Sequence, residues 1–349
     1  MDTIKKVTII CWTVSALALL GLVIWFIVQT PWGNALHWET GPFQPVGTHS
    51  IPTDNITSLQ VADWRAGAVI VRPHDGSEIE ITEFSIRQLS DDERLRLTVE
   101  NGSVIIHFAQ RAMQNNMPPK TLEVLIPHEL SESLAALSIN ATSGRVDVVD
   151  INAAELSARS SSGAVRLYNI TSQNLAATTT SGSVELFNVY AEQTNLQSSS
   201  GNVLASNTQT QDINARTTSG RIELSGSFEI INVNSSSGRI EVASDTHTQN
   251  INARTTSGRH NLSGSFTNIT AHSSSGNISV TSATTPESIN ARATSGNITV
   301  TVPSEEPISV RYSVTSGRFT SGVPVVTHSA DAQFNLATTS GRISIYELR

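Results

Sequence analysis

The chain is poor in cysteine, in lysine and in aromatic residues. Its 349 residues include one cysteine, Cys11, so it can form neither an intrachain disulfide nor a metal site built from cysteines. Only Lys5, Lys6 and Lys120 are lysines, and the net charge is −8. Nucleic-acid binders carry a basic surplus on one face, so this class of protein is excluded. Aromatic residues make up 5%, which argues against the aromatic-rich core of a globular enzyme.

Charged residues are also scarce, at 15%, and Ser, Thr and Asn are abundant in their place. A disordered acidic chain would carry more charge and fewer Val and Ile residues. The composition therefore predicts a folded chain, and the length is sufficient for two domains.

One long apolar run lies near the amino end. Residues Val7–Val28 are 22 consecutive positions without Asp, Glu, Lys or Arg. As a helix they span about 33 Å, which matches a hydrocarbon core of about 30 Å. The run is longer than the apolar region of a signal peptide and lacks a small-x-small cleavage site. Because Lys5 and Lys6 precede it, we expect a single-pass cell-membrane anchor with a cytoplasmic amino end and an extracytoplasmic remainder.

The segments after the anchor differ in pattern. We expect a cytoplasmic tip and transmembrane helix in residues 1–29, and a proline-containing stalk in residues 30–52. Residues 53–136 contain short β-rich runs separated by Asp75-Gly76 and Asn101-Gly102, which are hairpin signals. They predict a β-rich N-terminal part and cap. Residues 137–349 form a repeat region whose irregular stretch 303–335 is expected to cap its C-terminal end.

The repeat is a Ser-Gly pair preceded by Ser or Thr. It recurs at intervals of 18 to 24 residues, most often 19. The corner glycines are Gly144, Gly163, Gly182, Gly201, Gly220, Gly238, Gly258, Gly276, Gly296, Gly317 and Gly341. Eleven copies at a nearly constant period indicate a repeat architecture.

The residues flanking each glycine alternate between apolar and polar. The second residue after glycine is apolar in every copy except His260, and the fifth before it is apolar in all eleven. Spacing by twos on both sides of the corner predicts that each flanking strand points one face into a core. The residues between them carry Arg, Asn, Asp, Glu and Ser, and are expected to face water. Next to the corner the inward residue is small, as at Thr217 and Ser235.

This pattern predicts an all-β parallel β-solenoid with coils of about 19–20 residues, because stacking buries the apolar stripe that one unit cannot bury alone. Ten intervals of about 4.8 Å would extend roughly 50 Å. We expect glycine to supply a positive φ at the corner and the hydroxyls to satisfy corner backbone groups. An antiparallel meander is the competing topology. A coil of 38 residues also fits, because Ile213–Phe228 and Ile251–Phe266 are almost identical.

The arrangement resembles the bacterial putative-adhesin domain family of unknown function, a β-helix-like repeat family. The resemblance rests on the segment Leu122–Pro127 (LEVLIP), followed by successive Thr/Ser-Ser-Gly units that end in Thr339–Ile343. It covers about residues 50–349. It implies a surface or membrane-associated β-rich domain and assigns no catalytic residue.

The sequence offers no reactive cluster, metal-binding motif or cofactor motif, so we expect no enzymatic activity and no cofactor. The acids of the repeat region mostly lie one per unit, and the serines occupy a periodic corner slot. His260 is expected to be a core histidine with a local hydrogen-bond partner rather than a metal ligand. The alternative is a carbohydrate-active β-helix enzyme, a lyase or hydrolase. A groove lined by three or more Asp, Glu or Arg side chains would favour that enzyme.

Arginines gather in two outward slots beside the corners. Arg216, Arg254 and Arg292 lie four residues before a corner glycine, and Arg221, Arg239 and Arg259 follow one directly. In stacked coils they would form rows that bind an anionic wall polymer or lipid headgroup. The alternative is that they pair with Asp147, Glu185, Glu223 and Glu241 and keep the protein soluble. Residues 137–349 hold 13 arginines and 15 acids, so binding would be local and salt-sensitive.

The function expected from the sequence is therefore that of a membrane-anchored, non-enzymatic protein that displays a β-solenoid for adhesin-like binding or as an envelope scaffold. Its expected partners are the membrane and a wall or surface polymer or protein.

Overall fold

The computed structural model describes residues 43–109, 117–303, 306–327 and 333–348. The predicted membrane anchor and the first part of the predicted stalk lie outside these residues. Among the residues that the structure describes, no helix is long and apolar enough to cross a membrane. The short helix α2, His128–Ser131, is the one helix in this part of the chain.

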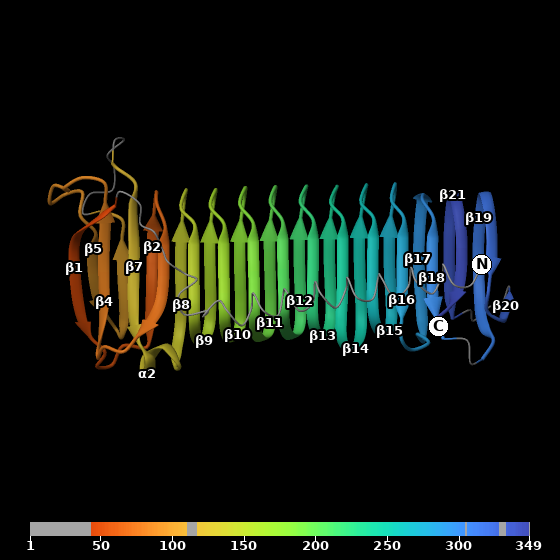
Figure 1. Cartoon of the computed structure of the whole chain (residues 1–349), viewed down its shortest axis with the longest axis horizontal. Helices are drawn as coiled ribbons and strands as arrows, with labels where there is room; N and C mark the ends of the chain where they lie inside the picture. The colour runs from red at the N-terminus through yellow and green to blue at the C-terminus, as the bar shows by residue number, and fades with distance from the viewer. Residues whose placement is uncertain (1–42, 110–116, 304–305, 328–332, 349) are drawn as a thin grey trace, which may run out of the picture. The chain divides into compact units, whose positions relative to one another are not determined.

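Long parallel strands follow one another through the repeat region (Figure 1). They are β9 (Val146–Ser160), β10 (Val165–Thr179), β11 (Val184–Ser198), β12 (Val203–Thr217), β13 (Ile222–Ser235), β14 (Ile240–Thr255) and β15 (His260–Ser273). Each pairs in parallel with the next, and Val165 lies between Val146 and Val184 in register. The offset is one Ser-Gly repeat. The β-solenoid with a coil of about 19 residues is confirmed, and the meander and the 38-residue coil are excluded.

Each coil bends twice between its Ser-Gly corners. Pairing of β10 with β11 is interrupted at Asn169 and again at Gln173, so a coil consists of three straight runs. Asn169 has a φ of 54°, and Asp150, Asn188 and Asn207 take the same left-handed conformation. Asn and Asp adopt this conformation more readily than other residues with a side chain. The amide Nδ2 of Asn169 donates to Oδ1 of Asp150 at 2.6 Å, and Asn188 donates to Asn169 at 2.8 Å.

The core is the apolar stripe that the alternation predicts. The second residue after each corner glycine is buried in ten of the eleven copies, for example Val165 and Ile222, each fully buried. The exception is Phe319, which is half-buried in an end strand. The predicted inward face is therefore confirmed.

At the N-terminal end the order of the coils departs from the order of the chain. Strands β2 (Ser58–Trp64) and β3 (Val69–His74) form a coil that pairs in parallel with β8 (Leu134–Ala141) and β9. Strands β6 (Ser103–His107) and β7 (Lys120–Pro127) pair in parallel with the outer side of that coil. Antiparallel strands complete this end: β5 (Arg96–Glu100) pairs with β6, β4 (Glu78–Ser85) with β7, and β1 (Gln44–Pro52) with β4.

A buried lysine holds this N-terminal part together. The Nζ atom of Lys120 lies 2.6 Å from a Glu83 carboxylate oxygen and donates to the carbonyls of Glu93 and Phe108. The rings of Trp64 and Phe108 flank it, and the Trp64 Nε1 donates to the Lys120 carbonyl at 2.9 Å. Burial lowers the pKa of Lys120, and the contact with Glu83 opposes that effect. Removing either partner would leave a buried charge without compensation.

The C-terminal end contains a second reversal. Strands β16 (Ile278–Ser282), β17 (Ser288–Ser295) and β18 (Ile298–Val302) continue the stack. The last strand, β21 (Phe334–Glu347), pairs with β17 and β18 on one side and with β19 (Ile308–Ser321) on the other. The corner of Gly341 thus stacks directly on Gly296, and Gly317 lies beyond it. Strand β20 (Val325–Thr327) pairs with the start of β19.

The expectation that the corner glycines supply a positive φ is wrong for all of them except Gly317. They are glycines because neighbouring coils approach too closely for a side chain. A Cβ on Gly201 would lie 1.8 Å from the carbonyl oxygen of Gly182, and one on Gly220 would lie 2.0 Å from that of Gly201. The same clash recurs at every corner.

Where Ser or Thr stands three residues before the glycine, its hydroxyl joins successive coils, as expected; Ala141, Ala293 and Val314 occupy this position before Gly144, Gly296 and Gly317. Ser198 Oγ donates to the carbonyl of Gly182 at 2.9 Å and accepts from the backbone N–H of Gly201 at 2.8 Å. The same pair of bonds is made by Ser160, Thr179, Thr217, Ser235 and Ser273. A buried hydroxyl and two corner backbone groups are thereby satisfied together.

These contacts predict effects of different size at two adjacent corner residues. Gly201→Ala should destabilise the protein by about 2 kcal/mol, because the new methyl group must push two coils apart. Ser200→Ala, at an exposed position of the same corner, should change stability by about 0.5 kcal/mol or less. Urea unfolding of the two variants measures the difference. Equal midpoints would contradict the close approach.

Candidate binding faces

The structure places one set of the predicted arginines in a single row. Arg216 on β12, Asn234 on β13, Arg254 on β14, His272 on β15 and Arg292 on β17 are neighbours in register. All five side chains are exposed. The arginines therefore stand on alternate coils, about 10 Å apart at about 4.8 Å per coil. Between them lie an amide and an imidazole.

A row of five asparagines and one threonine runs beside the arginines, two residues earlier in each coil. It consists of Asn195, Asn214, Asn232, Asn252, Thr270 and Asn290, each in register with the next. Asn214 accepts a hydrogen bond from Nε of Arg216 at 3.3 Å. Asn195, Asn214 and Asn232 line a shallow groove of about 660 Å³, to which Glu155 and Asp212 also contribute. We call the two rows together the arginine face.

The second set of arginines lies on a different run of the coil and is partly neutralised. Arg221 lies 3.6 Å from Glu223, and Arg239 lies 3.1 Å from Glu241. Arg221 and Arg239 therefore pair with an acid two residues further on, as the alternative interpretation of the sequence predicts. Arg259 lies in the same row, but Asn261 occupies the position of the acid. The structure thus separates the two sets, and the first set keeps more unneutralised charge.

One outward position departs from the expectation that these slots face water. The side chain of Asp147 is fully buried beside Arg145, at 2.8 Å, and Arg166, at 4.0 Å. Burial raises its pKa, and the two guanidinium groups oppose that effect. Arg166 also reaches Glu185 at 3.3 Å, so charges alternate across three coils. Parity along a strand predicts the face on which a side chain lies, but not its exposure.

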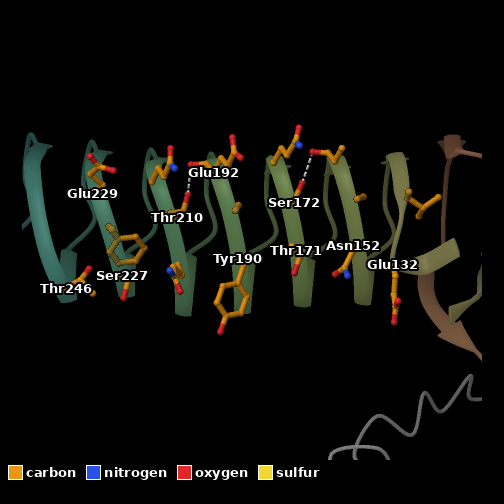
Figure 2. A pocket seen from close by; sticks show the side chains of 18 of the residues that line it. Glu132, Asn152, Thr171, Ser172, Tyr190, Glu192, Thr210, Ser227, Glu229 and Thr246 are labelled. Carbon is orange, nitrogen blue, oxygen red and sulfur yellow. Dashed lines mark hydrogen bonds between the residues drawn. The ribbon is translucent and has the colours of Figure 1, made fainter. Parts of the chain in front are cut away.

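A groove larger than that of the arginine face lies over another side of the coils, from β8 to β14 (Figure 2). Its volume is about 950 Å³. Glu132, Glu192 and Glu229 are among the residues that line it, together with Tyr190 and several amide and hydroxyl side chains. The groove therefore has the three acidic side chains that would favour an enzyme.

The geometry of these acids does not resemble a catalytic pair. All three are exposed, and Glu192 and Glu229 lie on coils two apart. A general acid is normally held protonated by burial or by a close like charge. In the part of the chain that the structure describes, no group of three or more His, Cys, Asp or Glu side chains could hold a metal ion.

His260 occupies the inward slot between Ile240 and Ile278. It is 1% exposed, and neither ring nitrogen has a hydrogen-bond partner among the described residues. The prediction that His260 has a local hydrogen-bond partner is therefore wrong. Burial lowers the pKa of His260 to about 4, and His272 adds a smaller effect in the same direction.

Comparison with known families agrees with the repeat architecture. The family model described as Toastrack (DUF4097) matches residues 63–242 and 226–346, which together span most of the chain. The chain belongs to the Toastrack family. The resemblance to an adhesin-like family of unknown function is thereby confirmed. A comparison with curated proteins found no match.

Several solved structures align with the Toastrack chain over most of its length at low similarity. A putative adhesin from Parabacteroides merdae is 10% identical, with a TM-score of 0.41 over 87% of this chain and 96% of that one. A putative lipid binding protein from Parabacteroides distasonis is 15% identical, with a TM-score of 0.36 over 88% and 97%. Because the identities are 15% or less and the TM-scores lie below 0.5, these structures do not indicate the function of this chain.

The buried histidine predicts a defined response to acid. Because its folded pKa of about 4 lies below the unfolded value of 6.5, the unfolded state binds the proton more tightly. The stability that His260 contributes is therefore complete above pH 6.5 and is lost as the pH falls towards 4, by roughly 3 kcal/mol. His260→Ile, which restores the residue type of the neighbouring coils, should flatten the dependence of the unfolding midpoint between pH 6.5 and 4.

The matched control is His247→Gln, at an exposed histidine bonded to Thr267. It should keep the pH dependence of the parent protein. If His260→Ile and His247→Gln show the same slope, the buried imidazole does not control acid stability.

Proposed function

We propose that this Toastrack protein is displayed outside the cell on a membrane anchor and binds an extended anionic polymer, without catalysis, on its arginine face. The observation that carries the proposal is the register of Arg216, Arg254 and Arg292, which repeats one guanidinium on every second coil. A linear polymer with regularly spaced phosphate or carboxylate groups can contact all three at once.

The chemistry of the row supports an anionic ligand. A guanidinium group offers paired N–H donors that match a phosphate or carboxylate in two parallel hydrogen bonds. No ion pair involves Arg254 or Arg292 among the described residues, so their charge is not neutralised by a neighbouring acid. Asn234 and His272 add donors between the arginines. Multivalent contact compensates for the weakness of each exposed pair.

The overall charge sets the conditions under which binding occurs. Because acids slightly outnumber arginines in residues 137–349, the protein exerts no strong attractive field at a distance. Attraction is confined to the arginine face, where exposed charges are screened over about 8 Å at physiological ionic strength. Binding should therefore weaken steeply as salt is raised.

A carbohydrate-active enzyme is the second candidate, and the three glutamates of the large groove favour it. Their exposure and their placement on separate coils speak against paired acid and base catalysis. Its test is the appearance of new reducing ends in a polysaccharide incubated with the protein.

Binding to the arginine face can be tested with matched triple variants. Arg216, Arg254 and Arg292 are changed together to Gln, and co-sedimentation with immobilised poly(glycerol phosphate) and polygalacturonate is measured at low and physiological salt. We expect at least a tenfold loss of affinity, since three charge-assisted contacts are removed.

The control variant changes Arg221, Arg239 and Arg259 to Gln and removes the same charge from the other row. It should bind within about twofold of the parent protein, because Glu223 and Glu241 already engage two of these arginines. An equal loss of affinity in both triple variants would show that binding depends on net charge rather than on the arginine face. Absence of binding by the parent protein would end the proposal.

The anchored topology is tested separately. With an epitope tag at the amino end, protease added to intact protoplasts should remove the repeat region and leave a short tagged fragment. This result follows if residues 7–28 span the membrane with Lys5 and Lys6 inside. A cytoplasmic marker protein must remain intact in the same sample. Protection of the repeats until the membrane is permeabilised would show that the orientation is reversed.

A further inference from the structure

The large groove of Figure 2 has a chemistry distinct from that of the arginine face. We call it the Tyr190 groove, after the aromatic side chain near its middle. It runs along the second bend of successive coils, so each coil contributes side chains at equivalent positions. One edge carries Asn152, Thr171, Tyr190, Gln209 and Ser227, which are neighbours in register.

The other edge follows the bend itself. It consists of Gln173, Glu192, Gln211, Glu229 and Gln249, all of which line the groove and all of which are exposed. The row thus alternates between a carboxamide and a carboxylate over five coils. Planar groups of this kind can bond two adjacent hydroxyls at once.

Tyr190 is the exposed aromatic residue of this groove. Its side chain is 48% exposed, and in Figure 2 it points away from β11. Its ring offers a ligand an exposed apolar face with a hydroxyl at the edge. Beside it small side chains form the floor, because the next residue of the coil is Ala191, and Ala153 lies two coils away.

The hydroxyls of the floor are already used by the fold. Ser172 Oγ donates to the carbonyls of Ala154 and Asn174, and Thr210 Oγ1 donates to those of Glu192 and Asp212. These bonds fix the bend in the coils of β10 and β12. The edges of the groove therefore stay in place without a ligand, and their amide groups remain turned to solvent.

The charge of the groove excludes the ligand of the arginine face. No arginine or lysine lines it among the residues that the structure describes, whereas three glutamates do. A polyanion would be repelled. A purely apolar ligand would leave the amides unsatisfied.

We propose that the Tyr190 groove binds a neutral polysaccharide chain that runs across the coils. The C–H face of a sugar ring packs on the tyrosine ring, and pairs of sugar hydroxyls bond the carboxamides and carboxylates of the opposite edge. The coil spacing of about 4.8 Å is close to the length of one monosaccharide unit, so successive sugars lie beside equivalent positions of successive coils. This site does not depend on the arginine face or on the membrane anchor.

The test is affinity electrophoresis of the full-length protein through gels that contain mixed-linkage β-glucan, mannan, dextran or polygalacturonate. The detergent must carry no sugar headgroup. We expect retardation by at least one neutral polysaccharide. Tyr190→Ala should weaken that binding about tenfold, whereas Tyr190→Phe, which keeps the ring, should stay within about threefold of the parent.

The chain offers a matched control in Tyr346, a tyrosine of strand β21 that is 50% exposed and lies outside the groove. Tyr346→Ala should bind as the parent protein does, as should the Arg216, Arg254 and Arg292 triple variant. Loss in Tyr346→Ala equal to that in Tyr190→Ala would overturn the site, and so would binding of polygalacturonate that depends on Tyr190. Failure of every neutral polysaccharide to retard the protein overturns it as well.

The polysaccharide from the gel is also assayed for new reducing ends. Retardation without cleavage supports the glycan site. Retardation with cleavage that Glu192→Gln or Glu229→Gln abolishes also supports the site, but it contradicts the non-enzymatic function proposed above. Neither result affects the proposal that the arginine face binds polyanions, which the triple arginine variants test separately.

Discussion

The close approach of successive corner glycines is the contact on which the rest of the structure depends. Each corner lies so near the one before it that a Cβ would fall about 2 Å from the neighbouring carbonyl oxygen. At six of these corners the same carbonyl accepts a hydrogen bond from a Ser or Thr hydroxyl, whose oxygen also accepts from the next glycine N–H. Steric exclusion and hydrogen bonding therefore select one alignment of the coils. Because a shift of one residue would exchange the inner and outer faces of every strand, this alignment also fixes the core.

In-register stacking turns each outward slot into a row, and the rows differ in what they can bind. The slot four residues before glycine carries arginine on alternate coils with few acids nearby, whereas the slot after glycine places Arg221 and Arg239 next to their own glutamates. The bend of the coil carries amides, carboxylates and one tyrosine. One coil geometry thus presents a cationic face and a separate uncharged-to-acidic groove. Two ligands of different chemistry can be held without competing for the same side chains.

Much of the fold could be predicted because the period of the sequence is the period of the structure. The inward slots, the parallel coil and the hydroxyl ladder all follow from alignment on Ser-Gly. The role of glycine could not be predicted, since a positive φ and a close approach demand the same residue. The Asn169–Asn188–Asn207 ladder was accessible from its spacing of 19 but was hidden among many other asparagines. The Tyr190 groove could not be predicted from the sequence, because the positions that form its edges carry different residue types from one repeat to the next. The partnerless state of His260 also depends on neighbours that only the stacked coils define.

The two ends show how a stack of identical strands avoids growing further. An exposed strand edge is a template for pairing with another chain, and parallel coils would offer one at each end. At the N-terminal end the chain switches to antiparallel pairing, and the outer strand β1 contains Pro45 and Pro52, which cannot donate to a further strand. At the other end β21 lies between β17 and β18 on one side and β19 on the other. The terminal coil is therefore formed by β19, which precedes β21 in the sequence. There the rings of Tyr312 and Phe319 on β19 stack with their centroids 4.1 Å apart, and the exposed Arg311 and Arg318 place charge along the same strand. The departures from chain order thus occur at the two places where a regular repeat would leave its edge open.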